Sequence, residues 1–165
     1  MLAGVYPGQS VAVVLEAATL AKELHRPLLC AYVAIDTYLA DWESGDRRNA
    51  ESLYPGDLGP ADDRIALDLA ASIAQTLNRM EPLEHGWSLR VLAGDPGHVL
   101  KIAADEVAAR LIVVGTHGSG AAHVVEAWLS GSVAAHLSRA TTRPVVVVPV
   151  AHEERGAEKL GRSPV

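Results

Sequence analysis

Three glycines after an apolar run are the residues of this chain best suited to bind a ligand. Gly115, Gly118 and Gly120 come directly after the run at 111–114, which is typical of a buried strand. Glycines at the carboxyl end of a parallel strand let backbone N–H groups approach phosphate oxygens, and a helix that begins nearby adds a favourable dipole. The spacing therefore favours a phosphate-binding loop at 115–120.

A second glycine and a hydroxyl follow where the next helix is predicted to begin, at Gly131 and Ser132. Together with the first glycines they would surround a phosphate from two sides. Equally, Gly115 can simply turn the chain, and Ser132 can simply cap a helix. The residue types alone leave both interpretations open.

Other chemistries that glycine, histidine and cysteine motifs can support are not favoured. No Gly-Lys pair exists, which excludes a P-loop. A nucleophile elbow at Ser119 fails because His117 stands at its first glycine position, and a dinucleotide fingerprint from Gly118 fails because His123 stands at its third. The seven histidines contain no H-x3-H pair and Cys30 is the single cysteine, so no metal site is predicted.

Composition narrows the class of protein further. Asp and Glu number 20 against 14 Lys and Arg, without a basic cluster, which argues against nucleic acid as the partner. No apolar stretch is long enough to cross a bilayer and no leader pattern opens the chain, so no membrane association and a cytoplasmic location are expected. Cys30 lies in an apolar run, which predicts a buried, inert thiol. The 165 residues suit one domain, predicted at 1–150, with a polar tail at 151–165.

Short apolar runs alternate with Ala-rich helical patterns, which favours a parallel sheet with crossover helices. Strands are predicted at 2–6, 28–35, 87–92, 111–114 and 144–150. Helices are predicted to begin near Ser10, Pro60 and Gly131, and a further helix follows a turn at 94–97. The apolar stripes of the first and third helices include Leu24 and Val107. Residues 36–60 read as a long loop whose aromatic residues either cover a ligand or pin the loop to the surface: Tyr38, Trp42 and Tyr54.

Nearly the whole chain resembles the universal stress protein family. Five motifs carry the resemblance in order: A-x-x-L-A-K-E-L at 17–24, A-G-D-P-G-x-V-L-x-x-A at 93–103, L-I-V-V-G-T-H-G at 111–118, G-S-V at 131–133 and R-P-V-V-V-V-P at 143–149. The resemblance implies an α/β, Rossmann-like fold: an open five-stranded parallel sheet of order 3-2-1-4-5 with helices on both faces.

The resemblance also implies a function and a set of site residues. It implies a non-enzymatic stress-response protein that binds ATP or another adenine nucleotide and forms a homodimer through its last strand, Val145, Val146, Val147 and Val148. The adenosine would be bound by Pro7, Gly8, Gln9 and Val33. The phosphates would be bound by Gly115, His117, Gly118, Gly131, Ser132 and Val133.

The chain departs from the family pattern at two places. Twelve residues, 119–130, separate Gly118 from Gly131, where nucleotide-binding members have nine. Residues 1–10 contain no acid, whereas those members end the first strand with an Asp that contacts the adenosine. A modified nucleotide site is therefore the leading hypothesis. The alternatives are a nucleotide-independent dimeric interaction module with a degenerate pocket, and a weak ATPase with Glu126 as the nearest carboxylate.

Overall fold

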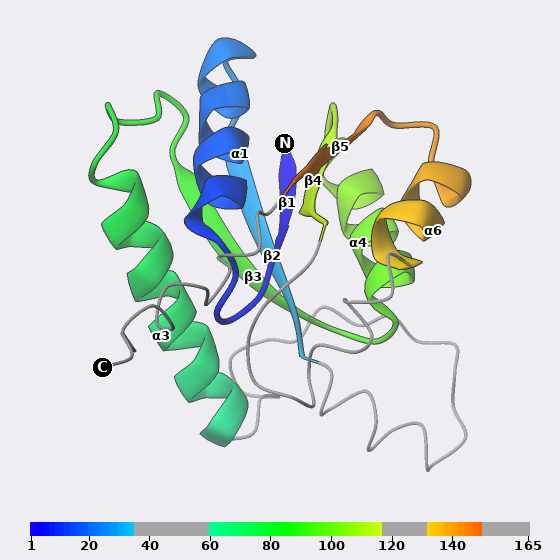
Figure 1. Cartoon of the computed structure of the whole chain (residues 1–165), viewed down its shortest axis with the longest axis horizontal. Coiled ribbons are helices and arrows are strands. Elements are labelled where there is room, and N and C mark those ends of the chain that lie inside the picture. Colours follow the sequence, from blue (N-terminus) through cyan, green and yellow to red (C-terminus); the bar gives the residue numbers. More distant parts are fainter. Residues whose placement is uncertain (35–59, 117–131, 150–165) are drawn as a thin grey trace, which may run out of the picture.

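A computed structural model of the chain describes residues 1–34, 60–116 and 132–149. Within these ranges five strands alternate with four helices (Figure 1). In chain order they are β1 (Leu2–Val5), α1 (Val11–Glu23), β2 (Leu28–Ala34), α3 (Pro60–Leu77), β3 (Trp87–Ala93), α4 (Pro96–Glu106), β4 (Ile112–Gly115), α6 (Ser132–Ala140) and β5 (Val145–Val148). In the same ranges, no helix combines the length and the apolar character needed to cross a membrane.

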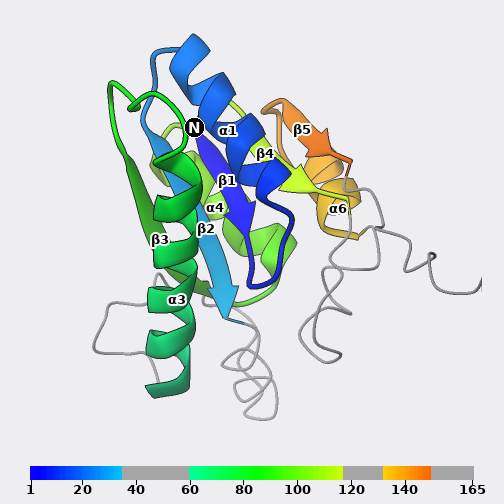
Figure 2. The same ribbon diagram turned by 60° about the vertical axis from the view of Figure 1, so that its left-hand side comes forward.

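The strands form one parallel sheet of order β3-β2-β1-β4-β5, which confirms the predicted topology. Helices α1 and α3 cover one face of the sheet, and α4 and α6 cover the other (Figure 2). β1 and β2 are buried along their whole length. Strands covered on both faces lack the alternation of polar and apolar residues, which explains why both read as continuous apolar runs.

Small aliphatic side chains fill the core between the two helical layers. Leu2, Ile112 and Leu137 are completely buried, and Ala17 and Ala104 let α1 and α4 lie close to the sheet. Cys30 on β2 is also completely buried, as predicted, and burial raises the pKa of its thiol to about 12. The thiol is therefore neutral at physiological pH, which fits an inert cysteine.

Leu24 and Val107 were predicted to belong to the buried stripes of their helices, but both lie at helix ends. Leu24 is the C-cap of α1 and is 44% exposed, and Val107 is the C-cap of α4 and is 37% exposed. The 3.6-residue period carries a side chain toward the core only while the chain stays helical. Both expectations were wrong because each helix ends one residue before the end of its apolar pattern.

α4 begins earlier than predicted, since its first turn takes up half of the expected turn at 94–97. The Asp95 side chain accepts a hydrogen bond from the His98 N–H at 2.9 Å, and Pro96 occupies the first helical position. An acidic N-cap satisfies a free N–H group of the first turn, and proline has no N–H to satisfy there. Asp95 therefore fixes the point at which the chain turns helical.

α4 ends with an alanine in the left-handed conformation. Ala108 has a φ of 45°, and the N–H of Ala109 donates to the Ala104 carbonyl at 2.8 Å. This is the hydrogen-bond pattern of a helix end that usually carries glycine, because a Cβ is strained at such a φ.

We expect Ala108→Gly to raise the free energy of unfolding by about 0.5–1 kcal/mol, because glycine relieves the left-handed strain. Ala135→Gly, inside α6, is the matched control and should lower it by about 1 kcal/mol. Urea titrations of both variants measure the two changes. Destabilisation by both replacements would contradict the strain at Ala108.

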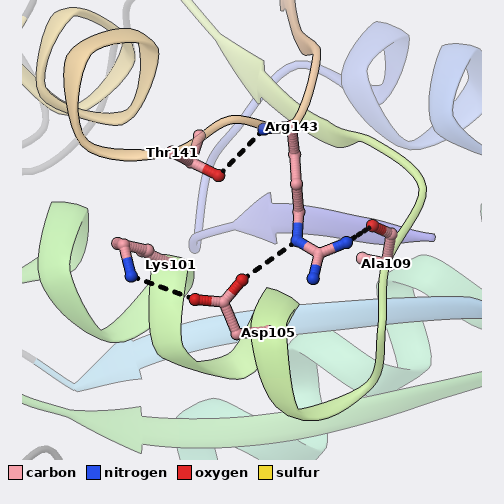
Figure 3. A network of polar contacts seen from close by, with 5 residues as sticks. All are labelled: Lys101, Asp105, Ala109, Thr141 and Arg143. Atoms are coloured by element: carbon pink, nitrogen blue, oxygen red, sulfur yellow. Dashed lines mark hydrogen bonds and ion pairs between the residues drawn. The ribbon is translucent and has the colours of Figure 1, made fainter.

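A polar network joins the end of α4 to the segments that lead into β4 and β5 (Figure 3). The Arg143 Nε donates to Asp105 Oδ1 at 3.1 Å, and its Nη1 donates to the Ala109 carbonyl. Lys101 Nζ donates to Asp105 Oδ2 at 3.0 Å. Because α4 ends where β4 and β5 begin, the network joins these elements at the amino edge of the sheet, opposite the edge at which β4 ends with Gly115.

The hydrogen bonds from Lys101 and Arg143 lower the pKa of Asp105 below its ordinary value of 3.8. A carboxyl group with a lowered pKa adds stability above its unfolded pKa and loses it as the pH falls through the folded pKa. We therefore expect the stability difference between the parent and Asp105→Asn to shrink between about pH 6 and about pH 3. Urea midpoints at both pH values test this, and a difference that does not change with pH would contradict it.

Candidate functional site

The order of the sheet reverses between β1 and β4, and these two strands part toward their carboxyl ends. Their register pairs stop at Ala3 and Val113, although β1 continues to Val5 and β4 to Gly115. Each strand stays paired over its four residues with its outer neighbour, β1 with β2 and β4 with β5. In open α/β sheets ligands bind at the carboxyl ends of the strands at such a reversal. The fold thus places a candidate site beyond Val5 and Gly115.

The end of β1 is closed by a turn from Tyr6 to Gln9. The Gln9 N–H donates to the Tyr6 carbonyl at 3.2 Å, and Gly8 has a φ of +76° after Pro7. Proline followed by a residue of positive φ is the pattern of a type II turn. Pro7 and Gly8 are exposed at this edge, so both are available to a ligand.

The Gln9 side chain folds back onto this turn. Its Oε1 accepts from the Tyr6 N–H at 3.1 Å, and its Nε2 lies 3.5 Å from the Gly4 carbonyl, to which it donates. Gln9 is predicted to bind the adenosine, and in this structure its amide hydrogen-bonds to the backbone next to Pro7 and Gly8.

On the other side of the reversal, β4 ends at Gly115, which is paired with Val148 and half-buried. The Thr116 N–H donates to the Val148 carbonyl at 3.0 Å, which ties the start of the following loop to β5. The glycine loop therefore leaves the sheet from a fixed point. His117, Gly118 and Gly131 lie outside the described residues, as do Tyr38, Trp42, Tyr54, Glu126 and the tail at 151–165.

Two predicted site residues belong to buried parts of neighbouring elements. Val33 on β2 is completely buried, and it lies one residue beyond the level of Val5, which pairs with Tyr32. Val133, in the first turn of α6, is 6% exposed. α6 begins at Ser132, as predicted, so the free backbone N–H groups of its N-terminus lie at this residue and those that follow it. A valine side chain has no polar atom. Any polar contact of Val33 or Val133 with a ligand would therefore be made by the backbone.

These segments meet at one edge of the sheet (Figure 1). α6 leads into the amino end of β5, so it runs opposite to the strands and begins at their carboxyl edge. A helix N-terminus carries free N–H groups and a partial positive charge, which suit an anion such as phosphate. Among the described residues, no group of three or more His, Cys, Asp or Glu side chains is placed to hold a metal ion.

Comparison with known proteins agrees with this geometry. The model of the Universal stress protein family matches residues 1–149. A universal stress protein structure from Archaeoglobus fulgidus is 18% identical, with 89% of this chain and 90% of that chain covered and a TM-score of 0.58. Among the curated proteins none matches the chain.

Two similar structures contain nucleotides. A universal stress protein in complex with cAMP is 20% identical, with 89% of this chain and 94% of that chain covered and a TM-score of 0.59. An Arabidopsis thaliana protein of the same family with AMP bound is 17% identical, with 96% and 97% covered and a TM-score of 0.50. At these identities the likeness establishes the shared fold.

Proposed function

Because the chain belongs to the universal stress protein family, we propose that it is a non-enzymatic, stress-associated protein that binds an adenine nucleotide at the carboxyl ends of β1 and β4. The observation that carries the proposal is the parting of these two strands beyond Ala3 and Val113, at the edge where α6 begins. The cAMP and AMP complexes of proteins with this fold support the choice of ligand.

The proposed site divides into an adenosine side and a phosphate side. Pro7, Gly8 and Val33 line the adenosine side, and Gln9 braces the turn that presents Pro7 and Gly8. The phosphate side is formed by backbone groups of the glycine loop and the first turn of α6: Gly115, His117, Gly118, Gly131, Ser132 and Val133. Backbone N–H groups bind a phosphate without a charged side chain. The adenosine side differs from that of the nucleotide-binding members, because residues 1–10 contain no acid.

The absence of turnover is also part of the proposal. Asp95 is the acidic residue that follows β3, and its carboxylate is engaged by the His98 N–H as the cap of α4. A general base has to reach the proton that it removes, and β2 separates β3 from the reversal. The proposed role is therefore binding, with the nucleotide as a ligand rather than a substrate.

Thermal unfolding with a panel of ligands tests this function. AMP, cAMP and ATP should each be compared with GTP, adenosine and inorganic phosphate. A ligand at 100 times its Kd adds about 2.7 kcal/mol to the free energy of unfolding, which is a readily measured shift. We expect at least one adenine nucleotide to give it and GTP to give none. No shift with any adenine nucleotide would overturn the proposal.

The second candidate function is a nucleotide-independent dimeric interaction module. β5 is an edge strand of four valines in which Val147 is 42% exposed. Exposed apolar edge strands pair with other chains unless they are covered or charged. Pairing of β5 with a second copy would satisfy this edge with or without a nucleotide.

We expect Val147→Lys to raise the dissociation constant of the homodimer at least about tenfold, because a charge on the edge opposes strand pairing. Sedimentation velocity over a dilution series measures the constant. Leu67→Lys is the matched control, because Leu67 is an exposed apolar residue on α3, 71% exposed, away from this edge. A monomeric parent, or a dimer that Leu67→Lys disrupts equally, would contradict pairing through β5.

A further inference from the structure

Helices α4 and α6 lie side by side on one face of the sheet, and both begin at its carboxyl edge (Figures 1 and 2). α4 follows the carboxyl end of β3, and α6 leads into the amino end of β5, so the two helices run in the same direction. Their relative height therefore decides how far the first turn of α6 extends toward the candidate site.

A glycine in α4 determines how closely the two helices approach. Gly97 is buried in the first turn of α4, and a Cβ built on it would lie 2.8 Å from both Cγ and Cδ2 of His136 and 3.1 Å from its Cβ. Real Cβ atoms essentially never approach other atoms to less than 3.0 Å. Turning the imidazole about its Cβ–Cγ bond leaves Cβ and Cγ in place, so the overlap with Cγ persists. A methyl group at residue 97 would therefore push the exposed His136 side chain into another rotamer or move α6.

The contact also sets the height of α6. Gly97 is the second residue of α4, and His136 is the fifth residue of α6. With a rise of about 1.5 Å per residue, the three-residue offset places the start of α6 about 4.5 Å beyond the start of α4. The part of α6 that extends past α4 is its first turn, which carries the free N–H groups.

We propose that Gly97 is a positioning residue of the nucleotide site: because it has no Cβ, α6 can pack closely against α4 at His136, and this close packing keeps the first turn of α6 where its N–H groups meet a phosphate. The inference rests on the proposed function. Gly97 lies on α4, which contributes none of the proposed nucleotide-binding residues. In this proposal Gly97 acts through α6 and not by its own contact with the nucleotide. A displacement of about 1 Å is enough to weaken contacts to a bound phosphate.

A double-mutant cycle tests the proposal with AMP as the probe. Isothermal titration should show that Gly97→Ala weakens AMP binding at least about tenfold. His136→Ala should change affinity less than about threefold, and the Gly97→Ala/His136→Ala pair should recover most of the loss because Cγ and Cδ2 are gone. Gly86→Ala is the control, because a Cβ there meets nothing within 4 Å. Equal affinity of Gly97→Ala and the parent would overturn the proposal and leave the proposed function standing.

Nuclear magnetic resonance gives a readout that needs no nucleotide. In the parent, nuclear Overhauser effects should join the Gly97 α protons to the His136 ring. In Gly97→Ala the amide signals of Val133 and Ala134 should move, and in the double variant they should return toward the parent. A parent that binds no AMP would reject the proposed function. Missing Overhauser effects, or signals of α6 that do not move, would reject the positioning role.

Discussion

Replacing Gly94 by alanine will lower the free energy of unfolding by about 2–4 kcal/mol. Gly94 connects β3 to α4 with a φ of +124°, a conformation that side chains rarely adopt. In addition, an added Cβ would lie 2.7 Å from Cγ1 of Val99, which is 3% exposed and packed in the core. Backbone strain and steric overlap therefore act together.

Gly86→Ala separates these two contributions. Gly86 also has a positive φ, +68°, but a Cβ there meets nothing within 4 Å. It should therefore show the backbone strain without the overlap, a loss of about 1–2 kcal/mol. Guanidinium unfolding of the parent and both variants measures the free energies. Equal losses at the two glycines would contradict the close approach of Val99 to Gly94.

Gly118→Trp will weaken nucleotide binding by about a hundredfold or more. Gly118 is the second glycine of the predicted phosphate loop, two residues after Thr116, where the chain is still tied to Val148. A bulky side chain at a backbone that approaches phosphate oxygens fills the space that the ligand needs. Titration calorimetry with AMP measures the loss.

Gly86→Trp is the matched control, because it makes the same replacement next to β3 at the amino edge of the sheet. It should cost stability and leave AMP affinity within about threefold of the parent. The oligomeric state should be unchanged in Gly118→Trp, since β5 contains no part of the glycine loop. Retained AMP affinity in Gly118→Trp would remove the glycine loop from the site.

The fold was predictable because two patterns, continuous apolar runs for strands and a 3.6-residue apolar period for helices, identify most of its elements. The continuous apolar runs of β2 and β4 indicated strands covered on both faces, and the helical pattern after the long loop indicated the helix that begins at Pro60. The errors fell at helix ends, where caps decide the boundary. Asp95 started α4 inside a predicted turn for this reason.

The candidate site was less predictable, because its residues make contacts that the local sequence pattern does not reveal. Gln9 has a side chain suited to an adenine edge, and no sequence pattern distinguishes that use from bracing the turn after β1. The approach of Gly97 to His136 joins residues far apart in the chain, so no local period reports it. In the sequence Gly97 is the last residue of a predicted turn, so no pattern marked its close packing.

The position of the bound nucleotide is tested most directly by following backbone amides of the isotope-labelled protein during an AMP titration. If AMP binds where β1 and β4 part, the signals of Gly8, Gln9, Thr116 and Val133 will shift together and saturate at one Kd. Signals at the opposite edge, such as those of Gly86 and Ala108, will stay in place. Saturable shifts confined to that opposite edge, or no saturable shift at all, would contradict a nucleotide site at the carboxyl ends of β1 and β4.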